Sequence, residues 1–218
     1  MAIRFADRHD AGRKLAGALH GYAGREDVLV LALPRGGVPV GYEVARALKV
    51  DFDILIVRKL GVPYQPELAM GAVASGGALY LNRSLIDQVG ISRHEIEAVL
   101  AAERTELTRR ERLYRGERPP SQIEGRIIIL VDDGVATGAS MHSAVMALRT
   151  GNPARIIVAV PVAPDDAGKR FEADAVEFVS LFSPAYFQAV GQFYDAFDQT
   201  SDEEVRDLLS QFQRESSS

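Results

Sequence analysis

The hydrophobic positions of this chain fall into short apolar runs separated by amphipathic stretches. Predominantly apolar stretches that end at polar or glycine-rich turns cover residues 28–33, 52–57, 127–131, 155–160 and 176–181. Runs of this length are typical of strands buried on both faces of a parallel sheet. Between them apolar residues recur at helical spacing, as at Val40, Val44 and Leu48. Alternating strands and helices predict an α/β fold with a doubly wound, mostly parallel sheet flanked by helices.

Capping signals and breaks predict further elements. Ser92 and Glu95 form a capping box that opens a long helix to about Arg115, and Ser201 and Glu204 form another before the last helix. Small residues around Ser75-Gly76-Gly77 predict a β-hairpin over 72–81, followed by a short helix over 83–89. Residues 60–71 contain prolines and glycines, and we expect an irregular segment there.

The run at 127–131 ends in two adjacent carboxylates, Asp132 and Asp133, before a loop of small residues. Such a loop bends tightly and leaves its amides open to a phosphate, and the helix that follows favours an anion at its first turn. Two carboxylates would repel a bare polyanion, but they suit sugar hydroxyls or a hydrated Mg²⁺. A phosphorylated sugar satisfies both halves of this site. The loop residues are Gly134, Val135, Ala136, Thr137, Gly138, Ala139 and Ser140.

The common nucleotide-binding motifs fit this segment less well. The chain has no Gly-x-x-x-x-Gly-Lys-Ser/Thr motif, and the loop lacks the Gly-x-Gly-x-x-Gly of dinucleotide-binding folds. A plain strand-turn-helix corner, in which one aspartate caps the helix, is the structural alternative. It leaves the second carboxylate unexplained, because a cap needs only one acid.

The segment from Val131 to Ser140 resembles the phosphoribosyl diphosphate (PRPP) signature of type I phosphoribosyltransferases. That signature is an apolar strand, two acidic residues and a small-residue loop that contains Thr-Gly and ends in Ser or Thr. The turn Pro34-Arg35-Gly36-Gly37 resembles the pyrophosphate loop of the same family, which often holds a non-proline cis peptide, here expected at or next to Arg35. Arg58 and Lys59 follow the second predicted strand, like the basic residues that several members use on pyrophosphate. Alternatively, the turn only starts a helix and the two cations are a solvated pair.

The resemblance implies a transferase that moves ribose 5-phosphate from PRPP to a nitrogenous acceptor, such as a nucleobase, and releases pyrophosphate. It implies Mg²⁺ as cofactor and a catalytic set of Asp132, Asp133, Arg35 and Lys59. The two aspartates would hold the ribose hydroxyls and, through water, the metal, while residues 134–140 would hold the 5-phosphate. Pyrophosphate would meet Arg35, Gly36, Gly37, Arg58 and Lys59. A second class of function is a non-enzymatic PRPP-binding regulator on the same fold.

One residue departs from the family pattern. Ala136 stands immediately before Thr-Gly, where transferases of the hypoxanthine and guanine type carry an aspartate that contacts the base. This argues against a 6-oxopurine bound in that manner. We expect the acceptor under a small hood drawn from residues 1–25 and/or 182–218, where aromatic rings that could stack on a base, or serve as core or dimer contacts, concentrate toward the C-terminus. Residues 60–71 take the place of the family's mobile loop, with Tyr64, Gln65 and Glu67 as candidates to enter the site.

Composition limits the remaining possibilities. A length of 218 residues suits a single phosphoribosyltransferase domain over 1–218. The net charge of -5 argues against a general attraction to nucleic acid, and the arginines of 104–118 alternate with glutamates as on a solvated helix. The chain has no cysteine, no secretory signal and no apolar run near the ~18 residues that span a membrane. We therefore predict a cytoplasmic enzyme of nucleotide metabolism that forms a homo-oligomer, with a dimer as the expected form.

Overall fold

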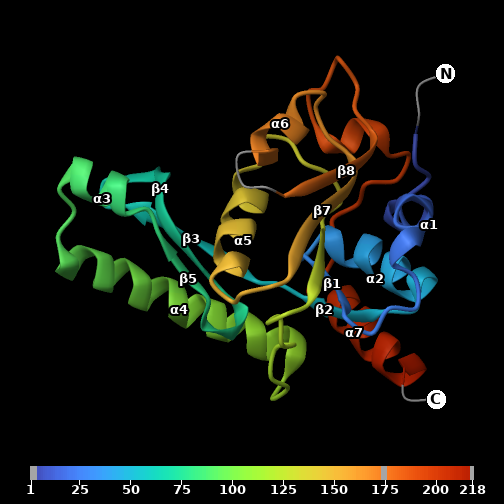
Figure 1. The fold of residues 1–218 in the computed structure, drawn as a ribbon, viewed down its shortest axis with the longest axis horizontal. Coiled ribbons are helices and arrows are strands. Elements are labelled where there is room, and N and C mark those ends of the chain that lie inside the picture. The colour runs from blue at the N-terminus through green and yellow to red at the C-terminus, as the bar shows by residue number, and fades with distance from the viewer. Residues whose placement is uncertain (1–3, 173–175, 217–218) are drawn as a thin grey trace.

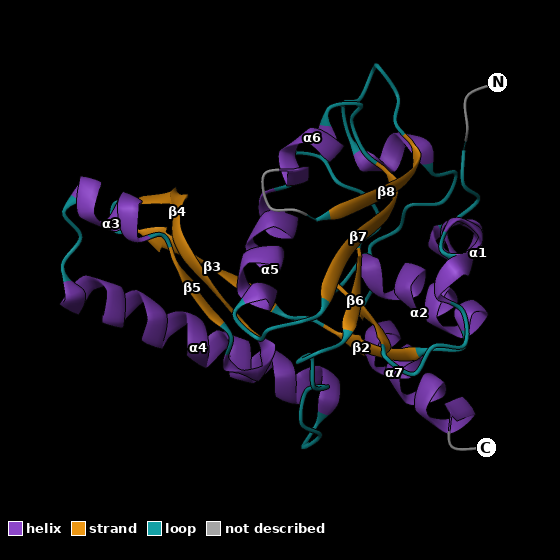
Figure 2. Ribbon diagram, viewed as in Figure 1, coloured by secondary structure: helices purple, strands orange, loops and turns teal. Residues whose placement is uncertain are grey.

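The computed structural model describes residues 4–172 and 176–216. Five parallel strands form its central sheet, in the order β2-β1-β6-β7-β8 (Figure 1). The strands are β1 (Val28–Ala32), β2 (Asp51–Ile54), β6 (Ile127–Val131), β7 (Arg155–Val162) and β8 (Glu177–Phe182). This sheet, with helices on both faces (Figure 2), confirms the predicted α/β fold.

Successive residues of each strand face two different helical layers, because side chains alternate across a sheet. Leu29 and Leu31 of β1 pack with α5 (Ala139–Arg149) and α6 (Ala167–Glu172) on one face. Val28 and Val30 pack with α1 (Arg8–Ala18) and α2 (Gly37–Leu48) on the other. Both faces of the sheet are therefore buried along β1, β6 and most of β7, which explains the continuous apolar runs of these strands.

A second sheet, with its own helices, forms an arm beside the central sheet (Figure 1). We define the arm as residues 57–115. Its antiparallel strands are β3 (Val57–Val62), β4 (Gln65–Ala74) and β5 (Leu79–Leu81), and the short 3₁₀ helix η2 (Ser75–Gly77) joins β4 to β5. The helices α3 (Arg83–Val89) and α4 (Arg93–Arg115) follow, and the predicted capping box of Ser92 and Glu95 opens α4.

Two expectations about the arm are wrong. Residues 60–71 are not irregular, since they form most of the β3–β4 hairpin. Gly61 and Pro66 lie close together across the two strands, so that a Cβ on Gly61 would stand 2.7 Å from the Pro66 carbonyl oxygen. The predicted strand over 52–57 is in fact two strands, because β2 ends at Ile54 and β3 begins at Val57. Arg58 and Lys59 therefore lie inside a strand rather than after one.

The segment before α1 meets residues 193–195 near the carboxyl edge of the central sheet. Phe5 donates its N–H to the Phe193 carbonyl at 2.8 Å and accepts from Asp195 N at 2.8 Å. The 3₁₀ helix η3 (Val190–Phe193) is in this region, η1 (His20–Tyr22) follows α1, and α7 (Asp202–Ser216) packs on α2 and α4. Phe5 and residues 193–195 belong to the two ranges from which we expect the hood, 1–25 and 182–218. Among the described residues, none of the helices has the length and apolar character needed to cross a membrane.

Candidate active site

The acidic pair and the β1 turn lie against each other at the carboxyl edge of the sheet. β1 and β6 pair in register, and Leu33 N donates to the Val131 carbonyl at 2.9 Å, so the segments that follow the two strands start side by side. A Cβ on Gly37 would lie 2.8 Å from the Val131 oxygen and 2.9 Å from Asp132 Cα, and one on Gly36 would collide with the Asp133 carboxylate. The two glycines are thus required by this contact, a reason that the sequence did not reveal.

The peptide bond between Pro34 and Arg35 is cis. The resemblance implied a non-proline cis bond at or next to Arg35, so this expectation is confirmed.

A cavity of about 440 Å³ opens at this edge of the sheet. The β1 turn, β3, α4, the end of β6 and the first turns of α5 all contribute to its wall. Asp132, Lys59, Ala139 and Ser140, four of the predicted site residues, line this one cavity. Its full lining is Leu33, Pro34, Leu55, Ile56, Val57, Lys59, Glu67, Arg110, Asp132, Ala139, Ser140 and Ser143.

The two aspartates occupy different environments. Asp132 borders the cavity, and its Oδ1 accepts from Asp133 N at 2.9 Å. Asp133 Oδ2 instead accepts from Arg8 Nε at 2.8 Å, with both side chains largely buried, and its backbone oxygen accepts from the Tyr194 hydroxyl at 2.6 Å. Burial raises the pKa of Asp132 well above its usual value, and the neighbouring Asp133 charge adds to this shift. Burial also raises the pKa of Asp133, while Arg8 opposes the rise.

The small-residue loop 134–140 is held from two sides. Val135 N donates to the Val162 carbonyl at 3.0 Å, which fixes the loop to β7. Gly138 has φ 80° and precedes α5, a left-handed conformation that suits glycine. Arg170 of α6 donates to the carbonyls of Thr137 at 2.9 Å and Ala136 at 3.3 Å. Arg170 was not among the predicted site residues, and no motif marks it, because its contacts lie more than thirty residues away along the chain.

The three predicted pyrophosphate cations each face a carboxylate. Arg35 Nη1 lies 3.7 Å from Asp202 Oδ1, at the start of α7. The cations of β3 pair with two glutamates: Arg58 Nε donates to Glu103 Oε2 at 2.6 Å, and Lys59 Nζ lies 3.2 Å from Glu67 Oε2.

Only Lys59 of these three cations lines the cavity, since Arg58 precedes it on β3 and points to the other face. Arg110, which we assigned to a solvated helix, lines the cavity as well and pairs with Glu106 at 2.7 Å. Of the three candidates from the β3–β4 hairpin, Glu67 lines the cavity, whereas Tyr64 and Gln65 are exposed at the tip of the hairpin.

The donor set of the site limits how it could hold a metal. Within residues 4–172 and 176–216, no three side chains of His, Asp or Glu gather closely enough to hold a metal ion. Asp132 is the member of the acidic pair that lines the cavity, while Asp133 is engaged by Arg8. With one carboxylate at the cavity, a hydrated Mg²⁺ bound here would take most of its oxygen ligands from water and from a substrate.

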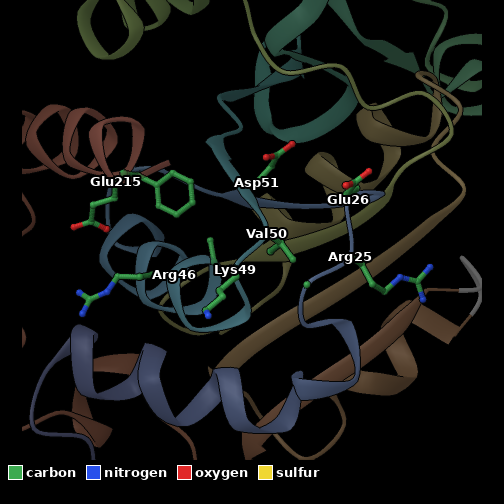
Figure 3. A pocket seen from close by; sticks show the side chains of 10 residues that line it. Arg25, Glu26, Arg46, Lys49, Val50, Asp51 and Glu215 are labelled. Atoms are coloured by element: carbon green, nitrogen blue, oxygen red, sulfur yellow. The ribbon is translucent and has the colours of Figure 1, made fainter. Parts of the chain in front are cut away.

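Another hollow, of about 620 Å³, lies at the opposite edge of the sheet, between the segments that precede β1 and β2 and the end of α7 (Figure 3). Three cationic and three anionic side chains line it: Arg25, Arg46, Lys49, Glu26, Asp51 and Glu215. None of the predicted site residues borders this hollow, so it is separate from the candidate active site.

The chain is similar to known proteins over nearly its whole length. Residues 6–195 match the family model described as "Phosphoribosyl transferase domain". The chain is 45% identical over 211 residues to "Putative phosphoribosyl transferase Rv0571c" of Mycobacterium tuberculosis (strain H37Rv), an alignment that covers 97% of this chain and 47% of that protein. The chain thus spans about half the length of the curated mycobacterial relatives that it matches.

A solved structure shares the fold from end to end. The crystal structure of TT1426 from Thermus thermophilus shares 43% identity and a TM-score of 0.87, covering 96% of this chain and 99% of that chain. A more distant relative is the "Bifunctional protein PyrR" of Brevibacillus brevis, 26% identical over 154 residues, which are 63% of this chain and 84% of that protein.

Proposed function

The chain belongs to the phosphoribosyl transferase domain family, and on this premise we propose that it transfers ribose 5-phosphate from PRPP to a nitrogenous acceptor and releases pyrophosphate. The observation that carries the proposal is the shared cavity of Asp132, Lys59 and the first turn of α5. A carboxylate, a cation and a helix N-terminus match the hydroxyls, the pyrophosphate and the 5-phosphate of this substrate. A nucleobase is the acceptor class that we propose.

In this reaction the bond between ribose C1 and pyrophosphate breaks while the acceptor nitrogen attacks. Positive charge grows on the ribose ring and negative charge on the leaving group. The Asp132 carboxylate would accept from a ribose hydroxyl and stabilise the ring charge, and Lys59 would stabilise the departing pyrophosphate. Loop 134–140 would bind the 5-phosphate and orient the reacting carbon with binding energy from outside the reacting bond.

Apolar side chains form much of the cavity wall. Leu33, Leu55 and Ile56 lie around the charged groups, and electrostatic attraction is stronger where water is excluded. A hydrated Mg²⁺ bound with PRPP would neutralise part of the pyrophosphate charge, with Asp132 contributing through water. All three predicted pyrophosphate cations have a carboxylate partner, but of the three Lys59 lines the cavity, so we assign the leaving group first to Lys59.

The test is pyrophosphate release from PRPP and Mg²⁺ with a panel of nucleobases, together with calorimetric PRPP binding. We expect Asp132→Asn to weaken PRPP binding at least tenfold, because a hydrogen bond to a charged group contributes about 1.5–3 kcal/mol. The matched control is Asp165→Asn, at an exposed acid outside the cavity, which should bind PRPP like the wild type.

Undiminished PRPP binding by Asp132→Asn would contradict the site. PRPP binding without turnover on any base would favour the alternative function, a PRPP-binding regulator. Dimer formation and a cytoplasmic location stay predictions.

A further inference from the structure

Arg8 is the first residue of α1, which lies across the central sheet from the arm (Figure 1), and its side chain contacts Asp133 of the acidic pair. Its Nε donates to Asp133 Oδ2 at 2.8 Å, and its Nη1 donates to the Asp198 carbonyl at 2.6 Å. The guanidinium carbon lies 3.9 Å from the ring centroid of Phe197. The Arg8 and Asp133 side chains are only 11% and 15% exposed, so this ion pair is shielded from water. Arg8 is therefore fixed by a carboxylate, a carbonyl and an aromatic ring at once.

Asp133 is held just as firmly. The Tyr194 hydroxyl donates to its backbone oxygen at 2.6 Å, and the absent side chain of Gly36 leaves room for its carboxylate. Tyr194 belongs to the segment that bonds to Phe5, three residues before Arg8. The start of α1 and the segment around Tyr194 thus converge on a single aspartate of the predicted site.

The two carboxylates are adjacent in the chain, and two unscreened negative charges so close together disfavour each other's ionised form. Arg8 compensates the charge of Asp133, while the cavity is open to Asp132. Because Asp133 already has a charged partner, breaking that pair to reach a substrate would leave a largely buried Arg8 uncompensated. The two acids therefore have different partners: Asp133 pairs with Arg8, and Asp132 faces the cavity.

We propose that Arg8 is a positioning residue of the PRPP site: it holds Asp133 away from the cavity, so that Asp132 alone meets the ribose hydroxyls. This inference rests on the proposed function, and it changes the role that the family resemblance implied for Asp133. Arg8 acts through Asp133 on the position of the adjacent Asp132 and does not touch the substrate. Its removal affects recognition of the ribose and leaves the pyrophosphate contacts of Lys59, on β3, in place.

The test is a double-mutant cycle measured by calorimetry in Mg²⁺, with PRPP and with inorganic pyrophosphate as separate probes. Arg8→Ala and Asp133→Asn should each weaken PRPP binding about tenfold, and the double variant should bind no more weakly than either, since coupled residues are not additive. Pyrophosphate affinity should stay unchanged in all three, and Arg8→Lys should restore part of the PRPP affinity. Arg13→Ala, on the same helix at an exposed arginine, is the control that should match the wild type.

Several outcomes would overturn the inference. Additive losses would mean that Arg8 does not act through Asp133, and a larger loss for Asp133→Asn than for Asp132→Asn would mean that Asp133 contacts the ribose itself. Equal losses for PRPP and pyrophosphate would show a general structural role. If Arg8→Ala does not fold, Arg8→Lys and Asp133→Asn provide the same comparison of the two probes.

The cycle also separates this inference from the proposed function. A folded wild type that binds no PRPP would overturn both. PRPP binding that is unaffected by Arg8→Ala would overturn the inference and leave the proposed function standing.

Discussion

Single residues decide how closely the β1 turn approaches the acidic pair. At Gly37 the nearest atoms to an added Cβ are backbone atoms of Val131 and Asp132, at 2.8 and 2.9 Å. Backbone atoms cannot rotate away as a flexible side chain can. We expect Gly37→Ala to lower the free energy of unfolding by about 1–3 kcal/mol, the usual cost of overpacking. Urea denaturation followed by circular dichroism measures the change.

The control for this prediction is Gly17→Ala. Gly17 lies on α1, where an added Cβ would meet no atom within 4 Å beyond its neighbours in the helix, and alanine is the better helix former, so this variant should gain up to ~1 kcal/mol. A loss of similar size in both variants would refute the steric explanation at Gly37.

At the same scale, the sequence predicts part of the site and not the rest. Asp132, Asp133 and the β1 turn can be recognised in the sequence, because each stands in a local motif at the end of an apolar strand. Arg8 and Tyr194 belong to no local motif, because they contact Asp133 from 125 and 61 residues away along the chain. Contacts of this kind depend on how the segments around Arg8 and Tyr194 fold back onto the sheet, which no local spacing in the sequence encodes.

At the scale of elements, α6 holds loop 134–140, the proposed 5-phosphate site, through one arginine. Arg170 bonds to the carbonyls of Ala136 and Thr137, and Asp166, one turn earlier on the chain, holds its guanidinium at 2.9 Å. We expect Arg170→Ala to weaken PRPP binding about threefold to tenfold, since a lost hydrogen bond contributes about 1 kcal/mol. The stability should change little, because Arg170 is exposed at the surface. PRPP titration of this variant beside Lys169→Ala, its exposed neighbour, measures the effect, and equal affinities would contradict this role of Arg170.

Elements with an unbroken apolar run or a clear helix cap could be predicted from the sequence, whereas the β3–β4 hairpin of the arm could not. The apolar run of β6 and the capping box of α4 lie where the sequence places them. In the hairpin, Gly61 and Pro66 look like chain breaks, although the strands need that glycine to approach each other. Leu55 and Ile56 extend the apolar run beyond β2 because the chain passes there, still buried, from the central sheet to the arm.

At the scale of the whole molecule, a buried ion pair joins the arm to the central sheet. Arg115, the last residue of α4, donates to Asp53 Oδ1 of β2 at 2.9 Å, to Ser75 Oγ at 3.3 Å and to the Ile54 carbonyl. The Arg115 and Asp53 side chains are 2% and 9% exposed, and the pair borders a cavity of about 750 Å³ between arm and sheet. Since Lys59 belongs to the arm and Asp132 follows a strand of the central sheet, this ion pair is one of the contacts, with the packing of the arm on α5 and α7, that fix how Lys59 and Asp132 face each other.

Removing one partner of this ion pair should loosen the arm more than the sheet. We expect Arg115→Met to lower the free energy of unfolding by about 3–5 kcal/mol, because Asp53 keeps a buried charge without its partner. The double variant with Asp53→Leu should recover part of that loss, since it removes the buried charge of Asp53, while the N–H groups of Ile54 and Ser121 lose their acceptor. The exposed Arg112→Met, on the same helix, is the control and should stay near the wild type. In hydrogen exchange, the amides of β3–β5 should lose more protection in Arg115→Met than those of β1 and β6. A uniform loss of protection would instead mean that the ion pair stabilises the whole domain and not specifically the attachment of the arm.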